Sequence, residues 1–448
     1  MQQFKTLEPT YMTTITKQTD SLTSTLLEAY KDVQLMPHAS SLRNEGRDLL
    51  HRIGLPANKE EEYKFTPISK KIEGTITRFS HAVPSESVNL KTVDENLIPG
   101  LECHLLVFNN GKLEKNLSNF GTSALSVISF VDLLEEKMEQ RVGKIAKADK
   151  DPFVALNQVA FQEGTWLEVA AKTVLEKPVF ILQLIQASQD GETVHPRAYI
   201  QVGKNAKVTF IEKVVSLDDS PYFLNGVTEI NVGENSQVDY YRVQDESKAA
   251  LEVNNTEVNV PRDATFSSAV ISLQGKMIRN NLSINLLDSN SIGNMYGLYM
   301  LNGKTHVDNH TNVDHTMPHA ESNELYKGIL ADHSRGVFNG KIFVRQDAQK
   351  TNAFQQNNNI LLSEDAVINT KPQLEIWADD VKCSHGCTTG QLDEEALFYL
   401  RSRGISKENS RGMLLYAFAG EVLEKINNEN FRDYCIGLIQ QRLGTHYA

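Results

Sequence analysis

Three side chains that could bind a metal stand close together near the C-terminal end of the sequence. Cys383, His385 and Cys387 occupy alternate positions of one short run, so in an extended strand they would point from the same face. At a rise of about 3.3 Å per residue, Cys383 and His385 would be roughly 6.6 Å apart at the backbone and could share a metal ion. Cys383 and Cys387 would be roughly 13 Å apart and could not, unless the chain turned at Gly386.

This set of ligands is incomplete by itself. A closed structural zinc site takes four ligands, and the sequence offers no second pair to complete the set. A transient metal, or one shared with another chain, is therefore a better interpretation than a preformed structural metal. The alternative, which the chemistry alone leaves open, is a buried cysteine and a hydrogen-bonded histidine at a junction between two structural units.

The residues on either side indicate a strand before the ligands and a helix after them. Leu374, Ile376 and Ala378 alternate with polar or bulky residues, which is the period of a strand with one buried face. Asp393, followed by two glutamates, is typical of a helix N-terminus, and the helix should end at Gly404. The candidate ligands therefore lie where the architecture changes.

A long region before the ligands has the period of β-strands, starting at about Thr165. Within it, Q-V-G-K-N-A-K-V-T-F and N-V-G-E-N-S-Q-V-D-Y align at an offset of thirty residues, and looser echoes begin at Val260, Leu287, Leu330 and Leu362. Repeated turns between short strands predict the rungs of a β-helix. An immunoglobulin-like sandwich is the alternative, but it rarely repeats a turn sequence and favours strands every 8 to 12 residues or so.

The two ends of the chain are expected to differ from this β region. The N-terminal part should be mixed, with helices over Thr13–Val33, Ser40–Ile53 and Val131 to about Ala146, and strands over Leu101–Phe108 and Leu125–Phe130. Near the C-terminus, Ser406 and Asn428 can cap two helices that could cover an open end of the β-helix or bind a partner. The expected units are residues 1–160, mixed α/β and largely helical; 161–390, a β-helix; and 391–448, helical.

A long signature runs from the ligands into the following helix. It reads A-D-D-V-K-C-S-H-G and then T-x-G-x-L-D-x-E-x-L-F-Y-L-x-S-R-G-I. It resembles the C-terminal signature of the SufB/SufD family, whose members assemble iron–sulfur clusters. Further matches to the family lie at Leu55–Pro67, Phe153–Asn157 and Gly336–Thr351. The resemblance therefore extends over nearly the whole chain.

Two features separate the branches of this family. SufB sequences typically have a cysteine shortly after an asparagine-rich rung and read H-E-A-T-T where this chain reads S-H-G. The corresponding run here, Thr351–Leu361, contains no cysteine, so the resemblance favours SufD. Cys387 stands where the family usually has a small residue, so the resemblance gives this thiol no role.

The resemblance implies a fold, a function and partners. The fold would be a right-handed parallel β-helix between N- and C-terminal helical regions. The chain would be a non-catalytic scaffold subunit of the SufBCD complex, joining SufB through the β-helix and the SufC ATPase through the C-terminal helices, or pairing with itself when isolated. His385 would bind iron or a nascent iron–sulfur cluster at the SufB interface, with Cys383 a weaker ligand. The iron or cluster would be transient, with none held tightly by the isolated chain.

Composition excludes several other classes of protein. The 448 residues, 40% of them hydrophobic, can form two or three packed units. A formal charge of −12 has the wrong sign for binding a phosphate backbone, so a nucleic-acid partner is not expected. The sequence has no apolar run of the roughly 20 residues that a membrane span needs, and its start lacks a signal core. Four cysteines do not make a disulfide framework, so we expect a cytoplasmic protein.

Two other groups of residues could suggest an active site. Four histidines crowd one polar stretch and a fifth follows a little further on, but Pro318 and the surrounding strands favour turn or stacking roles over a metal site: His306, His310, His315 and His319, then His333. Asp379 and Asp380 could suggest a carbohydrate-active β-helix enzyme, but adjacent strand residues point to opposite faces. The missing secretion signal also argues against that enzyme. The sequence has no G-x-x-x-x-G-K-[ST] loop, so any ATP hydrolysis would come from a partner.

Overall fold

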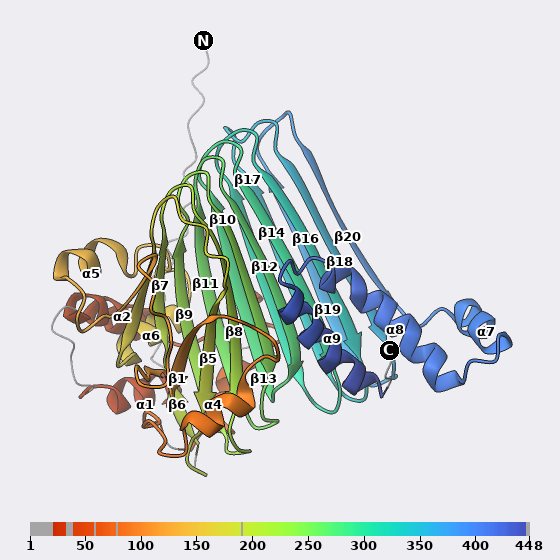
Figure 1. The fold of residues 1–448 in the computed structure, drawn as a ribbon, viewed down its shortest axis with the longest axis horizontal. Helices are drawn as coiled ribbons and strands as arrows, with labels where there is room; N and C mark the ends of the chain where they lie inside the picture. The colour runs from red at the N-terminus through yellow and green to blue at the C-terminus, as the bar shows by residue number, and fades with distance from the viewer. Residues whose placement is uncertain (1–20, 33–38, 58–59, 78, 190, 445–448) are drawn as a thin grey trace.

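The protein is a long parallel β-solenoid with helices at both ends of the sequence (Figure 1). The computed structural model describes residues 21–32, 39–57, 60–77, 79–189 and 191–444. Two ten-stranded sheets face each other, and from β7 onward the chain alternates between them strand by strand. The predicted parallel β-helix is confirmed, and the immunoglobulin-like sandwich is excluded because its strands are antiparallel.

Neighbouring strands within each sheet are mostly one full turn of the solenoid apart in the sequence. In spatial order, the first sheet contains β2 (Lys112–Leu113), β1 (His104–Asn109), β5 (Val179–Ile185), β8 (Lys207–Ser216), β10 (Gln237–Asp245), β12 (Thr265–Gln274), β14 (Ile292–Leu301), β16 (Glu321–Leu330), β18 (Asn352–Leu361) and β20 (Lys382–Gly390). The second contains β19 (Val367–Ile376), β17 (Arg335–Val344), β15 (His306–His315), β13 (Met277–Leu286), β11 (Leu251–Val260), β9 (Tyr222–Asn231), β7 (Arg197–Val202), β4 (Gly164–Val169) and β3 (Leu125–Ser129), with β6 (Glu192–Val194) beside β9. Only the short pairings β1 with β2 and β3 with β4, at one end of the solenoid, are antiparallel among the named strands of the described ranges.

The thirty-residue repeat seen in the sequence is one full turn of the solenoid. Val208 of β8 pairs with Val238 of β10, and Phe210 pairs with Tyr240, as the alignment of the repeat predicts. These side chains point into the lumen between the two sheets, where they join one extended apolar core. The repeat therefore stacks similar apolar side chains on one another from one rung to the next.

The turn within each repeat explains why asparagine recurs there. Asn205 and Asn235 have φ values of 57° and 55°, a left-handed conformation that asparagine adopts more readily than most residues. The Asn235 side-chain amide donates a hydrogen bond to Asn205 Oδ1 at 2.7 Å, so the two turns stack. Three of the looser echoes turn in the same way, with positive φ at Asp263, Asn290 and Asp332.

The N-terminal helices, except α4 (Leu90–Asn96), pack against the outer face of the second sheet. They are α1 (Ser21–Ala29), α2 (Ser40–Ile53), the 3-10 helix η2 (Glu61–Tyr63), α3 (Ile68–Glu73), α4 (Leu90–Asn96), α5 (Glu135–Arg141) and α6 (Pro152–Ala160). Leu50 of α2 and Val154 of α6 belong to the same buried cluster as Phe223 and Val253, which lie on the outer face of β9 and β11. Helix α4 stands apart from this group and lies beside the first sheet.

Predictions for this region were partly right. The helix Ser40–Ile53 is confirmed, and β1 and β3 match the two predicted strands. The predicted helix over Thr13–Val33 is present as α1, with residues 13–20 and 33 outside the described part of the chain. The long helix from Val131 to Ala146 was wrong. Only α5 forms, because Val142 is extended and Gly143 takes a φ of 79°.

Three helices follow the last strand: α7 (Glu394–Ser402), α8 (Lys407–Leu423) and α9 (Glu429–Leu443). Each begins at the predicted cap, where the side chains of Asp393, Ser406 and Asn428 accept hydrogen bonds from backbone N–H groups of the first turn. Helices α8 and α9 pack along the outer face of the first sheet, while α7 projects from the body of the molecule (Figure 1). The helices therefore cover a sheet face, and on the last rung most side chains of β20 are exposed while most of those of β19 are half-buried.

A buried lysine that pairs with an exposed glutamate helps to hold α8 in place. Lys327, on the outer face of β16, lies 2.7 Å from a carboxylate oxygen of Glu421 and donates to the backbone carbonyl of Phe418 at 3.1 Å. No helix within the described part of the chain is both long and apolar enough to cross a membrane.

Candidate functional site

The predicted ligands lie on β20, the last strand of the first sheet, at the open end of the solenoid (Figure 1). One edge of β20 pairs with β18. Its other edge pairs with no strand in the part of the chain that the structure describes, and the same is true of β19 in the second sheet. A strand edge without a partner can pair with another chain. The end rung therefore presents two such edges.

Cys383, His385 and Cys387 face the lumen side of this rung. In the parallel register they stand beside three buried, lumen-facing residues of β18, which are Ala353, Gln355 and Asn357. The strand runs on without a turn at Gly386. The two thiols are therefore on the same face but too far apart to share one ion within this chain, as the sequence predicted.

The three side chains differ in their exposure. Cys383 is half-buried and packs against a small apolar cluster with Val344 and Ala353. Burial raises the pKa of its thiol above the ordinary value, so metal binding there would require loss of a proton. His385 and Cys387 are exposed. Across the described ranges no three His, Cys, Asp or Glu side chains converge as a metal site.

A polar pair lies directly behind His385, one and two rungs further into the lumen. Gln355 Nε2 donates a hydrogen bond to Glu324 Oε2 at 2.6 Å. Burial raises the pKa of Glu324 to about 7. Sequence analysis missed this pair, although its signal was present: Gln355 and Glu324 occupy inward positions of adjacent rungs in the period-2 pattern.

A second polar group fills the lumen next to this pair. Asn359 Nδ2 donates to Asn357 Oδ1 at 2.8 Å, and Asn357 Nδ2 donates to the Tyr299 hydroxyl at 3.0 Å. Asn359 Nδ2 also reaches the backbone carbonyl of Thr388 on β20, at 3.4 Å. This group therefore links the last rung to the interior of the solenoid.

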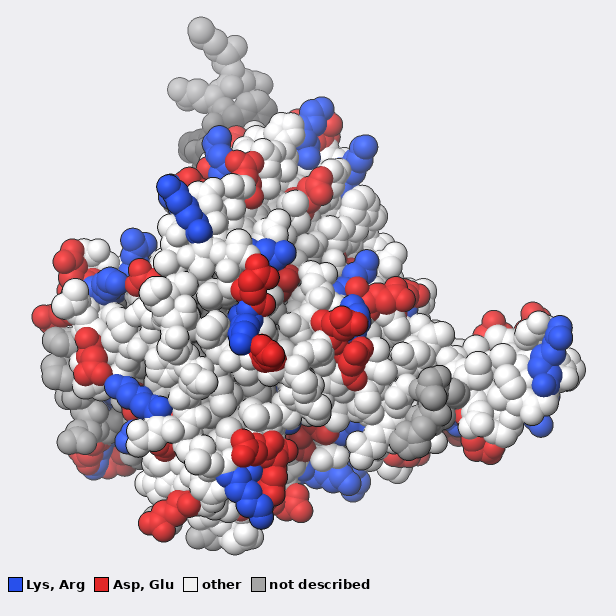
Figure 2. Space-filling view, in the orientation of Figure 1, with Lys and Arg blue, Asp and Glu red and all other residues white. Residues whose placement is uncertain are grey.

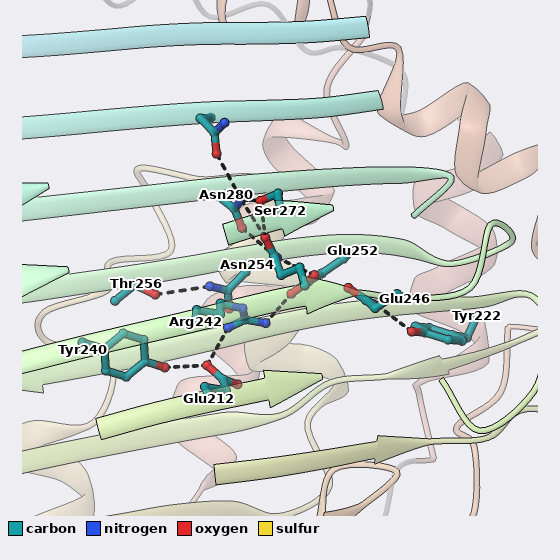
Figure 3. Close-up of polar contacts among 12 residues, drawn as sticks. Glu212, Tyr222, Tyr240, Arg242, Glu246, Glu252, Asn254, Thr256, Ser272 and Asn280 are labelled. Atoms are coloured by element: carbon teal, nitrogen blue, oxygen red, sulfur yellow. Dashed lines mark hydrogen bonds and ion pairs between the residues drawn. The ribbon is translucent and has the colours of Figure 1, made fainter. Parts of the chain in front are cut away.

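A larger buried network lies deeper in the lumen (Figure 3). Arg242 donates to Glu212 Oε2 at 2.7 Å and is also bonded to Glu252. The Tyr240 hydroxyl donates to Glu212 at 2.6 Å. Arg242 has the two carboxylates to offset its desolvation, so this group is a structural ion cluster that the sequence analysis did not anticipate.

The crowded histidines do not form one site. His306 and His310 lie on the outer face of β15, where they bond to Thr66 and to the carboxylates of Glu62 and Asp308. The other three lie apart from these and from one another. His315 in the lumen bonds to Ser322, His319 occupies a turn with a φ of 61°, and His333 at the surface lies near Asp365.

Asp379 and Asp380 lie in the turn between β19 and β20, so the strand geometry assumed from the sequence does not apply to them. Asp380 forms an exposed ion pair with Lys350. Because Lys350 already pairs with Asp380, this position does not favour a carbohydrate-active site.

The projecting helix α7 carries an exposed apolar surface. Phe398 is 73% exposed and Tyr399 is 57% exposed, whereas Leu397 on the same helix is buried. In Figure 2 this projection shows charges of both signs around an uncharged patch. Large exposed aromatic side chains side by side are typical of a binding surface.

Comparisons with protein-family models and with known proteins point to the same family over most of the chain. Residues 184–418 match the SufBD core domain of the SUF system for FeS cluster assembly, and residues 17–181 match the SufBD protein N-terminal region. An iron–sulfur cluster assembly SufBD family protein of Synechocystis sp. is 33% identical over 398 residues, which is 86% of each chain. The iron–sulfur cluster assembly protein SufD of Escherichia coli is 32% identical over 396 residues, 88% of this chain and 90% of the relative.

Proposed function

Because this chain belongs to the SufBD family of iron–sulfur cluster assembly proteins, we propose that it is a SufD-like scaffold subunit without catalytic activity of its own. In this role it would present His385, with Cys383 as a weaker ligand, to iron or a nascent cluster. The observation that carries the proposal is the position of these ligands. They form a short, incomplete row at the uncovered end of a β-solenoid, beside two strand edges that another chain could pair with.

The chemistry of the row suits temporary binding. A neutral imidazole is a good borderline ligand for iron. An exposed side chain also releases a bound metal readily, and a scaffold must release its product. The remaining ligands would come from a SufB-like chain whose own strands continue the sheets beyond β19 and β20. Such a shared site also explains why this chain lacks a full ligand set.

The projecting helix α7 supports a second contact. Its exposed Phe398 and Tyr399 offer an apolar surface that the solenoid itself does not need. We infer that this surface receives the SufC-type ATPase, since the chain has no phosphate-binding loop. Helices α8 and α9 would carry this contact indirectly, because they fasten α7 to the first sheet.

The decisive experiment substitutes His385 in a strain that depends on this system. His385→Ala should leave purification of the complex and its thermal stability nearly unchanged, because the side chain is exposed, while cluster formation in cells collapses. Cys387→Ala, which removes an exposed thiol two positions away on the same face, is the matched control and should be mild. Normal cluster formation with His385→Ala would refute the proposed site. Loss of the complex would show that His385 has a structural role instead.

A further inference from the structure

We propose that Gln355 is a positioning residue for His385, and that Glu324 in turn fixes the direction of the Gln355 amide. The inference rests on the proposed function, because it assigns a task to residues directly behind the proposed ligand. The Gln355 carbonyl oxygen has no hydrogen-bond partner in the part of the chain that the structure describes, and in the proposed arrangement it accepts a hydrogen bond from one ring nitrogen of His385. The other ring nitrogen is then left without a proton and available to a metal at the open end.

The first support is the register of the strands. His385 of β20 stands beside Gln355 of β18, and Gln355 stands beside Glu324 of β16. All three face the lumen, so they form one row that runs inward from the open end. Neighbouring strands lie about 4.8 Å apart, which is within the reach of a glutamine amide and an imidazole ring on adjacent rungs.

The second support is the state of the Gln355 amide. Its side chain is 1% exposed, and its nitrogen is committed to Glu324. Its oxygen is buried and has no hydrogen-bond partner among the described residues. An unsatisfied buried acceptor typically costs about 1–3 kcal/mol. Because the nitrogen faces the inner rung, the oxygen on the other side of the amide is free for a donor from the outer rung, where His385 stands.

The third support comes from the opposite sheet. Gly340 of β17 faces this amide across the lumen, and a Cβ atom at position 340 would lie 2.3 Å from Gln355 Nε2. The same Cβ would lie 2.8 Å from Phe338 Cζ, so a side chain at position 340 would displace the Gln355 amide from where it lies. The φ of Gly340 is not in the left-handed region, so space rather than backbone conformation accounts for the glycine, and the space is taken by Gln355 and Phe338.

The arrangement matches a general requirement of histidine ligands. A ring that binds a metal through one nitrogen usually donates its other N–H to a carboxylate or carbonyl oxygen, which fixes both the tautomer and the orientation. Loss of such a partner typically costs 10- to 100-fold, roughly, in metal affinity or activity. Gln355 supplies the carbonyl oxygen for this role, and Glu324 keeps the amide from turning its nitrogen outward.

The test measures the tautomer of His385 directly. Long-range proton–nitrogen spectra of the full chain labelled with ¹⁵N-histidine, at a pH where imidazole is neutral, distinguish the two tautomers, and His385→Ala assigns the signal. The native chain should show one dominant tautomer. Gln355→Met should give a mixture like that of the exposed His51, whereas Gln356→Leu, on the outward face of the same strand, should change nothing. Cluster formation in cells should fall 10- to 100-fold or so with Gln355→Met alone.

A second variant guards against a folding defect. The double exchange Glu324→Gln with Gln355→Glu swaps the acid and the amide, so the donor now lies on residue 324 and an acceptor oxygen still faces His385. It should retain the single tautomer. If Gln355→Met leaves the tautomer unchanged, or if the double exchange gives a mixture, the inference is wrong. These readings do not depend on cluster assembly, so a failure of the proposed function, seen as normal assembly with His385→Ala, is a separate result.

Discussion

Replacing Glu324 by glutamine should make the protein more stable at alkaline pH than the native chain, and nearly equal to it at pH 5. Glu324 is 4% exposed in the lumen, and burial raises its pKa from 4.5 to about 7. The substitution keeps the shape of the side chain and an oxygen that can still accept the hydrogen bond from Gln355 Nε2. It removes only the capacity to become charged.

The size and sign of the effect follow from the pKa. Between pH 4.5 and 7 the folded native chain keeps a proton on Glu324 that the unfolded chain has lost. The free energy of unfolding therefore falls as pH rises through this window, and the full cost is present above pH 7. At about 1.4 kcal/mol per pH unit, the interval between 4.5 and about 7 corresponds to about 3 kcal/mol. Glu324→Gln should remove this cost.

Urea denaturation followed by the fluorescence of the buried Trp166 can measure the difference. At pH 5 the unfolding free energies of the native chain and Glu324→Gln should agree closely. At pH 8.5 the variant should be more stable by about 3 kcal/mol. Glu321→Gln, at an exposed position of the same strand, is the matched control and should give the same difference at both pH values. If the stability difference for Glu324→Gln is also independent of pH, the lumen around Glu324 is wetter than its burial indicates and the reasoning fails.

Three further predictions concern other parts of the molecule. Arg242→Met should lower the unfolding free energy by about 3–5 kcal/mol in a calorimetric or urea experiment, because it leaves Glu212 and Glu252 buried without their cation; a loss below about 1 kcal/mol would show that water enters the network. Asn235→Val should lower the free energy of unfolding by about 1–2 kcal/mol, since a β-branched residue resists the left-handed turn. Asn235→Gly should lower it by less. Equal losses would mean that the hydrogen bond between the Asn205 and Asn235 side chains, rather than the backbone conformation, stabilises the turn. Phe398→Ser with Tyr399→Ser should abolish capture of the proposed SufC-type ATPase partner, while pairing with the proposed SufB-like chain persists, as measured by co-purification. Undiminished capture would place the docking surface elsewhere.

The sequence predicted the repeating part of the fold well because each rung carries its own local signals. The stacked asparagine turns and the alternation of Val208 and Phe210 are visible in short windows, and the register of β8 with β10 follows from aligning them. Helices with clear N-caps, such as the helix that begins after Asp393, were predicted equally well. The helix expected after Val131 failed because the charged pattern continues beyond Arg141, although the backbone turns away at Gly143.

Only part of the candidate site could be predicted from the sequence. The spacing of Cys383 and His385 predicted their common face, and the strand confirms it. Nothing local to that run points to Gln355 and Glu324, which are thirty and sixty-one residues away in the sequence. Their proximity depends on which strands are neighbours in the solenoid and on the register between them. Likewise, the direction in which α8 and α9 pack depends on apolar residues of β12 and β14 that face outward.

The two ends of the solenoid are chemically unlike, and this limits how far molecules of this shape can associate through strand pairing. At the beginning, each sheet ends in a short antiparallel strand pairing, β1 with β2 and β3 with β4. At the far end, β19 and β20 stop without a cover among the described residues. In the language of polymerisation, such a molecule is monofunctional, because it has one reactive end. When two molecules join, the reactive end of each is used, and no reactive end remains for a third molecule. Strand pairing here should give discrete pairs and never fibres, which lets the protein keep a bare sheet end.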